Sequence, residues 1–100
     1  MNLKFRAEML GRTEEEIRSE MASALGRIGR KFQYLVAQVK QLEPAMEIGP
    51  AEARERYWEV LQEARLYYWY LIVQRESVGL RNHEDVHREY AVPVAVLRRK

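Results

Sequence analysis

The chain lacks cysteine entirely, and among its 100 residues it has only two histidines, three prolines and five glycines. Without cysteine the protein has no disulfide framework, no thiolate metal site and no cysteine nucleophile. No uninterrupted apolar run approaches the roughly 18 residues of a membrane span. The charged residues Lys4, Arg6 and Glu8 interrupt the start of the chain, so no signal peptide is expected. These absences predict a cytoplasmic protein without a membrane segment.

The chain also has little excess charge of either sign. Its formal net charge is +2, from 17 basic and 15 acidic residues. Arg98, Arg99 and Lys100 supply three of the positive charges, which leaves a net −1 on the rest of the chain (+2 minus 3). A protein that binds duplex DNA usually carries a basic stripe across its folded surface. The charge pattern therefore argues against nucleic acid as a partner.

Apolar residues, in contrast, are abundant and follow a helical pattern. Thr13 followed by Glu16 matches the capping box of a helix start. Apolar residues then recur in alternating steps of four and three, which is typical of a helix packed along a neighbouring helix. We expect the first long helix over residues 13–43. Its apolar seam consists of Met21, Leu25, Ile28, Phe32, Leu35, Val39 and Leu42.

A second long helix is expected over residues 50–78. Pro44 and the Gly49-Pro50 pair mark a short connector before it. A short connection between two long helices makes them antiparallel neighbours. The sequence therefore predicts an all-α fold, a single domain over residues 1–100 built on an antiparallel helical hairpin. The seam expected to face the first helix consists of Tyr57, Leu61, Ala64, Tyr68, Leu71 and Val78.

Shorter elements are expected at both ends of the chain. Residues 1–12 form either an arm or a short helix. Gly79 would end the second long helix, because glycine readily adopts the left-handed conformation there. Asn82 can cap a short helix over residues 82–90, and residues 93–100 are expected to form a basic tail.

The second helix carries more apolar residues than one partner can cover. Residues 67–73 contain no charge, and a helix that is apolar all round must be covered on every side. A single hairpin cannot supply that cover, so we expect a homodimer or higher homo-oligomer in which two hairpins form a four-helix bundle. The residues expected in its interface are Trp58, Leu66, Trp69, Tyr70, Ile72 and Val73.

Two overlapping motifs around the histidines resemble metal sites. The run from His83 to His87 resembles the zincin motif H-E-x-x-H, which would imply zinc on both histidines and Glu84 as general base. Glu84 and His87 also resemble half of the di-iron site of helical bundles. Both histidines fall at the start of a short, exposed helix, and the chain has no third histidine. We expect them to be incidental, with no metal, no cofactor and no enzymatic activity.

A pair of glycines lies in the middle of the first long helix. Gly26-Arg27-Ile28-Gly29 resembles the GXXG phosphate clamp of KH domains, but that domain needs strands and no alternating strand pattern is present. Each mid-helix glycine costs roughly 1 kcal/mol relative to alanine. We expect Ala22, Gly26 and Gly29 to allow another helix to approach closely.

The C-terminal segment resembles the helix-turn-helix pattern of DNA-binding proteins. It has apolar Val86, a turn at residues 91–93, and apolar Leu97 in a basic second segment. The resemblance implies a regulator that contacts DNA through the segment from Val86 to Lys100. The basic residues that would make this contact are Arg98, Arg99 and Lys100.

This segment departs from the helix-turn-helix pattern at two positions. Family members usually have a small residue where His87 stands, because the two helices cross closely there. They usually have glycine where Ala91 stands, because the turn needs a positive φ. The sequence therefore favours a small non-enzymatic protein that acts through oligomerisation and protein–protein interaction, with a DNA-associated regulator as the alternative.

Overall fold

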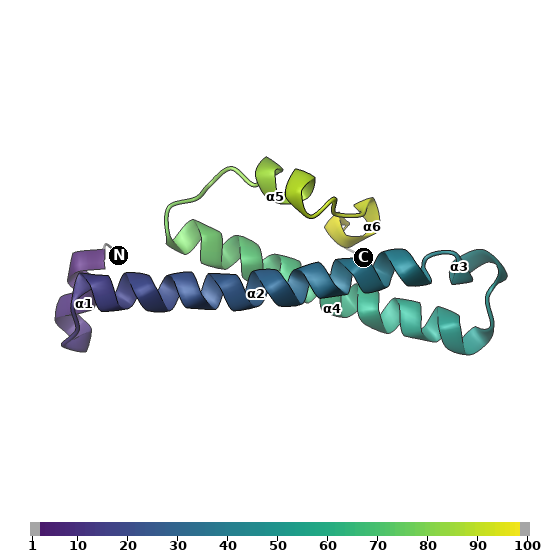
Figure 1. The fold of residues 1–100 in the computed structure, drawn as a ribbon, viewed down its shortest axis with the longest axis horizontal. Helices are drawn as coiled ribbons and strands as arrows, with labels where there is room; N and C mark the ends of the chain where they lie inside the picture. Colours follow the sequence, from purple (N-terminus) through teal and green to yellow (C-terminus); the bar gives the residue numbers. More distant parts are fainter. Residues whose placement is uncertain (1–2, 99–100) are drawn as a thin grey trace.

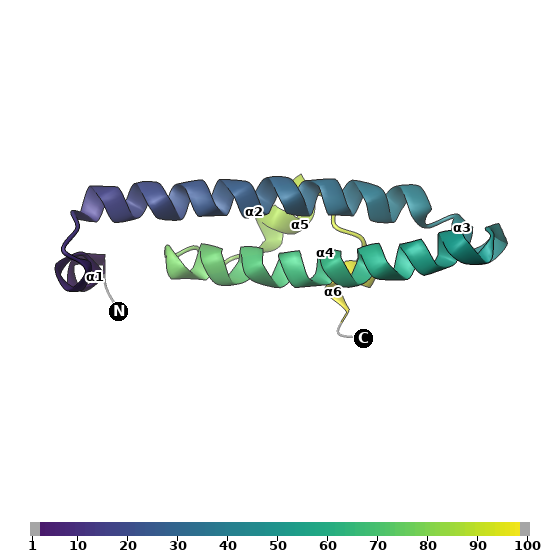
Figure 2. The same cartoon turned by 90° about the horizontal axis from the view of Figure 1, so that it is seen from below.

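The computed structural model describes residues 3–98, and every regular element in that range is an α-helix. The two longest helices lie side by side and antiparallel (Figures 1 and 2), so the predicted all-α helical hairpin is confirmed. In this described part of the chain, no helix is long and apolar enough to cross a membrane. The elements are α1 (Leu3–Leu10), α2 (Glu14–Leu42), α3 (Ala45–Ile48), α4 (Ala51–Ser77), α5 (Glu84–Glu89) and α6 (Val94–Leu97).

The start of α2 is fixed by the capping box that the sequence predicts. The Thr13 hydroxyl accepts a hydrogen bond of 3.1 Å from the backbone N–H of Glu16. The Glu16 carboxylate in turn accepts from the backbone N–H of Thr13 at 3.4 Å. The Thr13 hydroxyl also donates to the Glu16 carboxylate at 3.0 Å. This bond, together with the backbone bond to the carboxylate, favours its charged form and holds the pKa of Glu16 below its ordinary value. The reciprocal pair satisfies two donors that the first turn of a helix leaves free.

The core lies along the contact between α2 and α4. Phe32 and Val39 on α2 and Ala64 on α4 are fully buried, and they belong to the two seams that the apolar spacing predicts. The connector between the helices is also more ordered than a simple loop. It contains the single turn α3, and Gly49 donates its backbone N–H to the carbonyl of Ala45 at 3.0 Å.

Helices α5 and α6 fold back over one side of the hairpin (Figure 1). Val86 of α5 and Val96 of α6 are both buried, at 2 % exposure each. Residues 93–98 are therefore more than a tail, because α6 packs against α4. In Figure 2, α6 lies at the edge of α4 that faces away from α2.

A glycine in α2 makes room for α5. The ring of Tyr90 packs edge-on against Phe32, with the centroids 5.6 Å apart. A Cβ atom at Gly29 would come within 2.9 Å of the Tyr90 hydroxyl, closer than such contacts normally allow. The predicted close approach to the small residues of α2 is therefore made at Gly29, by an aromatic side chain at the end of α5.

The molecule is long for its size. Its radius of gyration is 16.8 Å and its extents are 56 × 23 × 20 Å, whereas a compact 100-residue domain has a radius of gyration of about 13 Å. An elongated shape leaves more surface in water per residue than a sphere does. Several large apolar side chains remain on that surface.

Two glycine substitutions test the contact between α2 and Tyr90. Alanine stabilises a helix interior by about 1 kcal/mol relative to glycine. At Gly26 the new Cβ would meet only a flexible arginine end at 3.4 Å, so Gly26→Ala should raise the free energy of unfolding. Gly29→Ala should lose that gain, because Tyr90 must move. We expect G29A to be at least about 1 kcal/mol less stable than G26A in urea unfolding, and equal stabilisation by both would contradict this contact.

Candidate functional site on the outer face of α4

The side of α4 that faces away from α2 carries large apolar side chains that are open to water. Tyr57 is buried against α2. Leu66 follows nine residues later, which at 3.6 residues per turn places it on the opposite side of the helix. Trp69 is 60 % exposed and Trp58 is 49 % exposed. The residues of this surface, called the outer face below, are Trp58, Leu66, Trp69, Tyr70 and Val73, all of them exposed.

The aromatic rings of the outer face are held in place by their neighbours. The centroids of Trp69 and Tyr70 are 6.0 Å apart, and Tyr70 packs edge-on against Tyr67 at 5.3 Å. Trp58 likewise packs edge-on against the buried ring of Tyr57, at 5.6 Å. Rings fixed in this way lose little conformational freedom when a partner covers them.

Ile72, which the sequence assigns to the same set, lies elsewhere. It is half-buried and lines a groove of about 360 Å³ between α4 and α6, together with Trp69, Val96 and Leu97. Val94 and Leu97 of α6 are exposed, so they extend the apolar surface beyond α4. The spacing of apolar residues in α4 could not reveal this, because α6 is distant in sequence.

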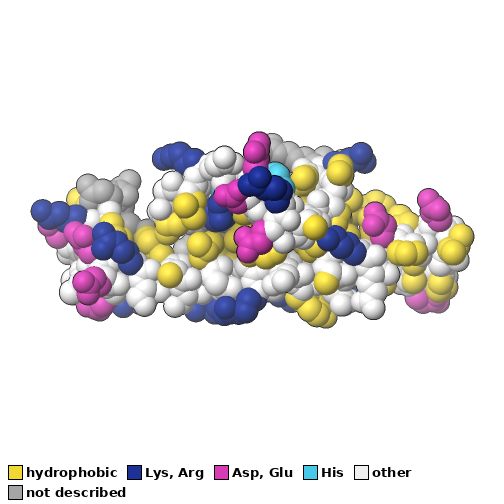
Figure 3. All heavy atoms as spheres, turned by 45° about the horizontal axis from the view of Figure 1, so that its top comes forward, with side chains coloured by type: hydrophobic (Ala, Val, Ile, Leu, Met, Phe, Trp, Pro, Cys, Tyr) yellow, Lys and Arg dark blue, Asp and Glu magenta, His cyan; other side chains and the backbone are white. Residues whose placement is uncertain are grey.

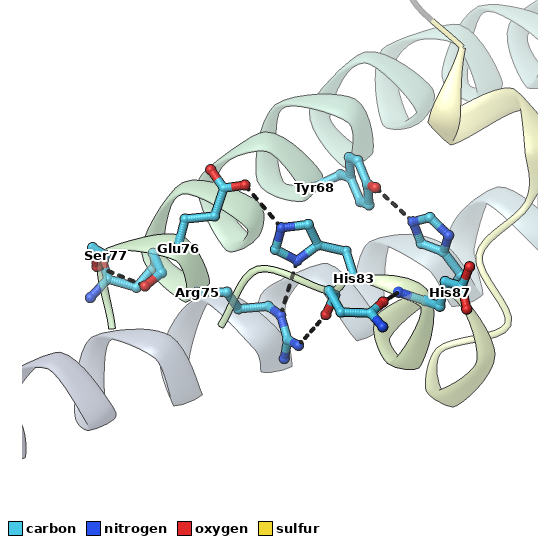
Figure 4. Close-up of polar contacts among 9 residues, drawn as sticks. Tyr68, Arg75, Glu76, Ser77, His83 and His87 are labelled. Atoms are coloured by element: carbon cyan, nitrogen blue, oxygen red, sulfur yellow. Dashed lines mark hydrogen bonds and ion pairs between the residues drawn. The ribbon is translucent and has the colours of Figure 1, made fainter. Parts of the chain in front are cut away.

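Both histidines take part in attaching α5 to α4 (Figure 4). The Tyr68 hydroxyl and Nε2 of His87 share a hydrogen bond of 2.7 Å. Arg75 donates its Nε–H to Nδ1 of His83 at 3.3 Å, and Nε2 of His83 lies 3.1 Å from the Glu76 carboxylate. The expectation that these histidines are solvent-exposed is therefore wrong. The His83 side chain is only 16 % exposed.

The same contacts leave little of the H-E-x-x-H motif free for a metal. Both ring nitrogens of His83 already have partners. Glu84 is exposed, and its backbone N–H donates to the Asn82 side chain at 3.0 Å. The N-cap of α5 is His83, one residue later than the sequence predicts. Across residues 3–98, no group of three or more histidine, aspartate and glutamate side chains comes together in a way that could hold a metal ion.

The spacing of polar residues in the sequence contains one signal that α5 is attached to α4. His83 and His87 are four residues apart, so they lie on one face of a short helical segment. Tyr68 and Arg75 are seven residues apart and share one face of α4. Each of these polar groups is matched by one on the facing element, and burial raises the pKa of Tyr68 above its ordinary value.

A family model of the family of unknown function DUF6665 matches residues 7–99. The chain belongs to this family. The match spans both long helices, α5 and α6, so the whole arrangement of hairpin and cover lies within the matched region. No curated protein and no solved structure matches the chain.

The C-terminal segment has one helix-turn-helix feature and lacks others. Ala91 adopts a positive φ of 48°, the turn conformation for which family members usually have glycine. However, α5 has six residues and α6 only four, and α6 packs on α4. Arg98 is exposed beside the groove, while Arg99 and Lys100 lie outside the described residues.

On the face drawn in Figure 3, basic and acidic side chains are interspersed, and hydrophobic ones gather at the hairpin end that carries α3.

Tyr68→Phe tests the attachment of α5. The change removes the hydroxyl that bonds to His87 and leaves a half-buried ring nitrogen without its partner, so the free energy of unfolding at pH 7 should fall by about 1 kcal/mol. Tyr34→Phe, which removes an exposed hydroxyl from α2, should change it by less than about 0.5 kcal/mol. Both are measured by urea unfolding, and equal effects would contradict the bond.

The same variant carries a pH signature. Because the pKa of Tyr68 is raised in the folded chain, the folded chain keeps the phenol proton at a pH where the unfolded chain has lost it. This part of the stability is fully present below the unfolded pKa of about 10 and is lost as pH rises through the folded pKa. Tyr68→Phe should therefore lose less stability than the unmodified chain as the pH rises above about 10.

Proposed function

We propose that this protein is a small, non-enzymatic interaction protein that acts as a homodimer, with the outer face of α4 as its self-association surface. The observation that carries the proposal is this surface itself, with two tryptophans and a tyrosine held exposed by packed neighbours. Tryptophan and tyrosine are the residues most enriched among those that dominate binding energy at protein interfaces.

The accessible surface of the chain supports the same conclusion. It amounts to 7233 Å², whereas a folded monomer of 11.9 kDa is expected to expose about 5,900 Å². The excess is about 1,300 Å². A standard stable interface covers about 800 Å² on each partner, so covering the outer face would bring the protein close to the surface of an ordinary globular chain.

The position of the outer face sets the arrangement of the proposed dimer. The face lies on the side of α4 opposite α2, so two copies that meet there bring α4 against α4. The four long helices would then form a row with the two copies of α4 in the middle. This is a four-helix assembly in which α6 of each copy flanks the contact.

A DNA-associated regulator is the second candidate, and the positive φ of Ala91 is the observation that favours it. Such a regulator would contact phosphates through Arg98, Arg99 and Lys100, and its retention on a DNA column would fall steeply with salt. Replacing these three residues with alanine would then abolish retention. A chain that is not retained at low salt would exclude this candidate.

The homodimer is tested by removing its central aromatic residues. Trp69→Gln together with Tyr70→Gln should convert the protein to folded monomers, because the double variant lacks the two rings that the second copy is proposed to cover. Tyr34→Gln removes a comparably exposed tyrosine from α2 and should leave the dimer intact. Size-exclusion chromatography with light scattering gives the mass of each, and circular dichroism reports folding. A folded double variant that is still dimeric would overturn the proposal.

A further inference from the structure

The outer face has a protruding residue at one end and a groove at the other. Trp58 lies near the start of α4, and the groove beside α6 is lined by Trp69, Ile72, Val73 and residues of α6. Trp58 and Val73 are fifteen residues apart, which is about 22 Å along the helix. Trp58 therefore cannot reach the groove of its own copy.

We infer that the groove between α4 and α6 receives Trp58 of a second copy, in an antiparallel and two-fold pairing of the two α4 helices. This inference rests on the proposed homodimer and specifies its geometry. The groove measures about 360 Å³, roughly the volume of a dozen waters, and an indole ring has nine non-hydrogen atoms. In a two-fold pair each copy both donates a tryptophan and accepts one.

The antiparallel direction follows from the positions of the two features. In an antiparallel pair, residues at equal distances on either side of the midpoint face each other. Placing Trp58 opposite Val73 puts the midpoint beside Leu66 and places Gln62 opposite Trp69. A parallel pair would instead stack Trp58 on Trp58 and leave both grooves without a ring.

The same pairing brings Arg54 of one copy close to Glu76 of the other. Arg54 lies one turn before Trp58, and Glu76 lies one turn after Ile72 at the rim of the groove. Arg54 is exposed and has no ion pair among residues 3–98. Glu76 is about half-exposed and bonds only to His83. Glu55 lies eleven residues before Leu66 and about 20° from it round the helix, so it faces the second copy as well. The positive charge of Arg54 must therefore offset both Glu55 and the Glu76 of the second copy.

Another arginine lies near the midpoint and must be accommodated. Arg65 donates its Nε–H to the carbonyl of Ala95 at 3.0 Å, and its side chain is partly buried beneath α6. This bond directs the guanidinium toward α6 of its own copy and away from the second copy. The two midpoint arginines therefore need not meet when the copies pair.

Site-specific cross-linking tests the pairing in a chain that has no cysteine of its own. Chains carrying Arg54→Cys and chains carrying Glu76→Cys are treated with a short bifunctional maleimide, separately and mixed. We expect cross-linked dimers in the mixture and little product from either chain alone. A mixture of Arg56→Cys and Glu76→Cys chains is the matched control and should give little product. Arg56 is exposed and lies about 200° from Arg54 round the helix, on the flank away from α6.

The outcomes separate this inference from the homodimer itself. A dimeric mass without the mixed Arg54–Glu76 product, or with product from each chain alone, overturns the pairing and keeps the homodimer. A monomeric mass at all concentrations overturns both.

As an independent measurement, Trp58→Ala should raise the dimer dissociation constant by about 30-fold or more, whereas Tyr34→Ala should change it by less than about 3-fold. Equal effects would also overturn the inference.

Discussion

The packing of α2 against α4 is the contact on which the rest of this structure depends. Two helices that lie side by side bury only the strip along which they touch, and here that strip contains Phe32, Val39 and Ala64. Every other apolar residue on the two helices must be covered by something else or remain in water. One further side of the hairpin is covered by α5 and α6, and the large side chains of the outer face of α4 stay exposed in the described part of the chain. The proposed homodimer follows from this remaining surface.

The cover formed by α5 and α6 combines apolar and polar contacts. Val86 and Val96 supply buried apolar side chains, and Gly29 leaves space for Tyr90. Tyr68 and Arg75 then bind the two histidines, so polar groups that become partly buried keep hydrogen-bond partners. Because α6 lies against α4 at its outer edge, the cover also forms one wall of the groove. The element that completes the fold of one copy thus shapes the surface proposed to meet the next.

The sequence predicted the features that depend on local spacing. The capping box at Thr13 and Glu16 and the two seams that include Phe32 and Leu61 are set by residues within a few turns of each other. The excess of apolar residues on α4 was likewise visible, and five of the six residues assigned to it are exposed. The role of the histidines was not visible, because it depends on Tyr68 and Arg75 facing them across a loop. The half-burial of Ile72 depends in the same way on where α6 packs.

We propose that a second copy of the same chain covers the outer face of α4. Native mass spectrometry of the unmodified protein over a series of concentrations tests it most directly. We expect a species of twice the 11.9 kDa chain mass that persists to low micromolar concentration. A mass of one chain at every concentration, with the fold intact, would contradict it.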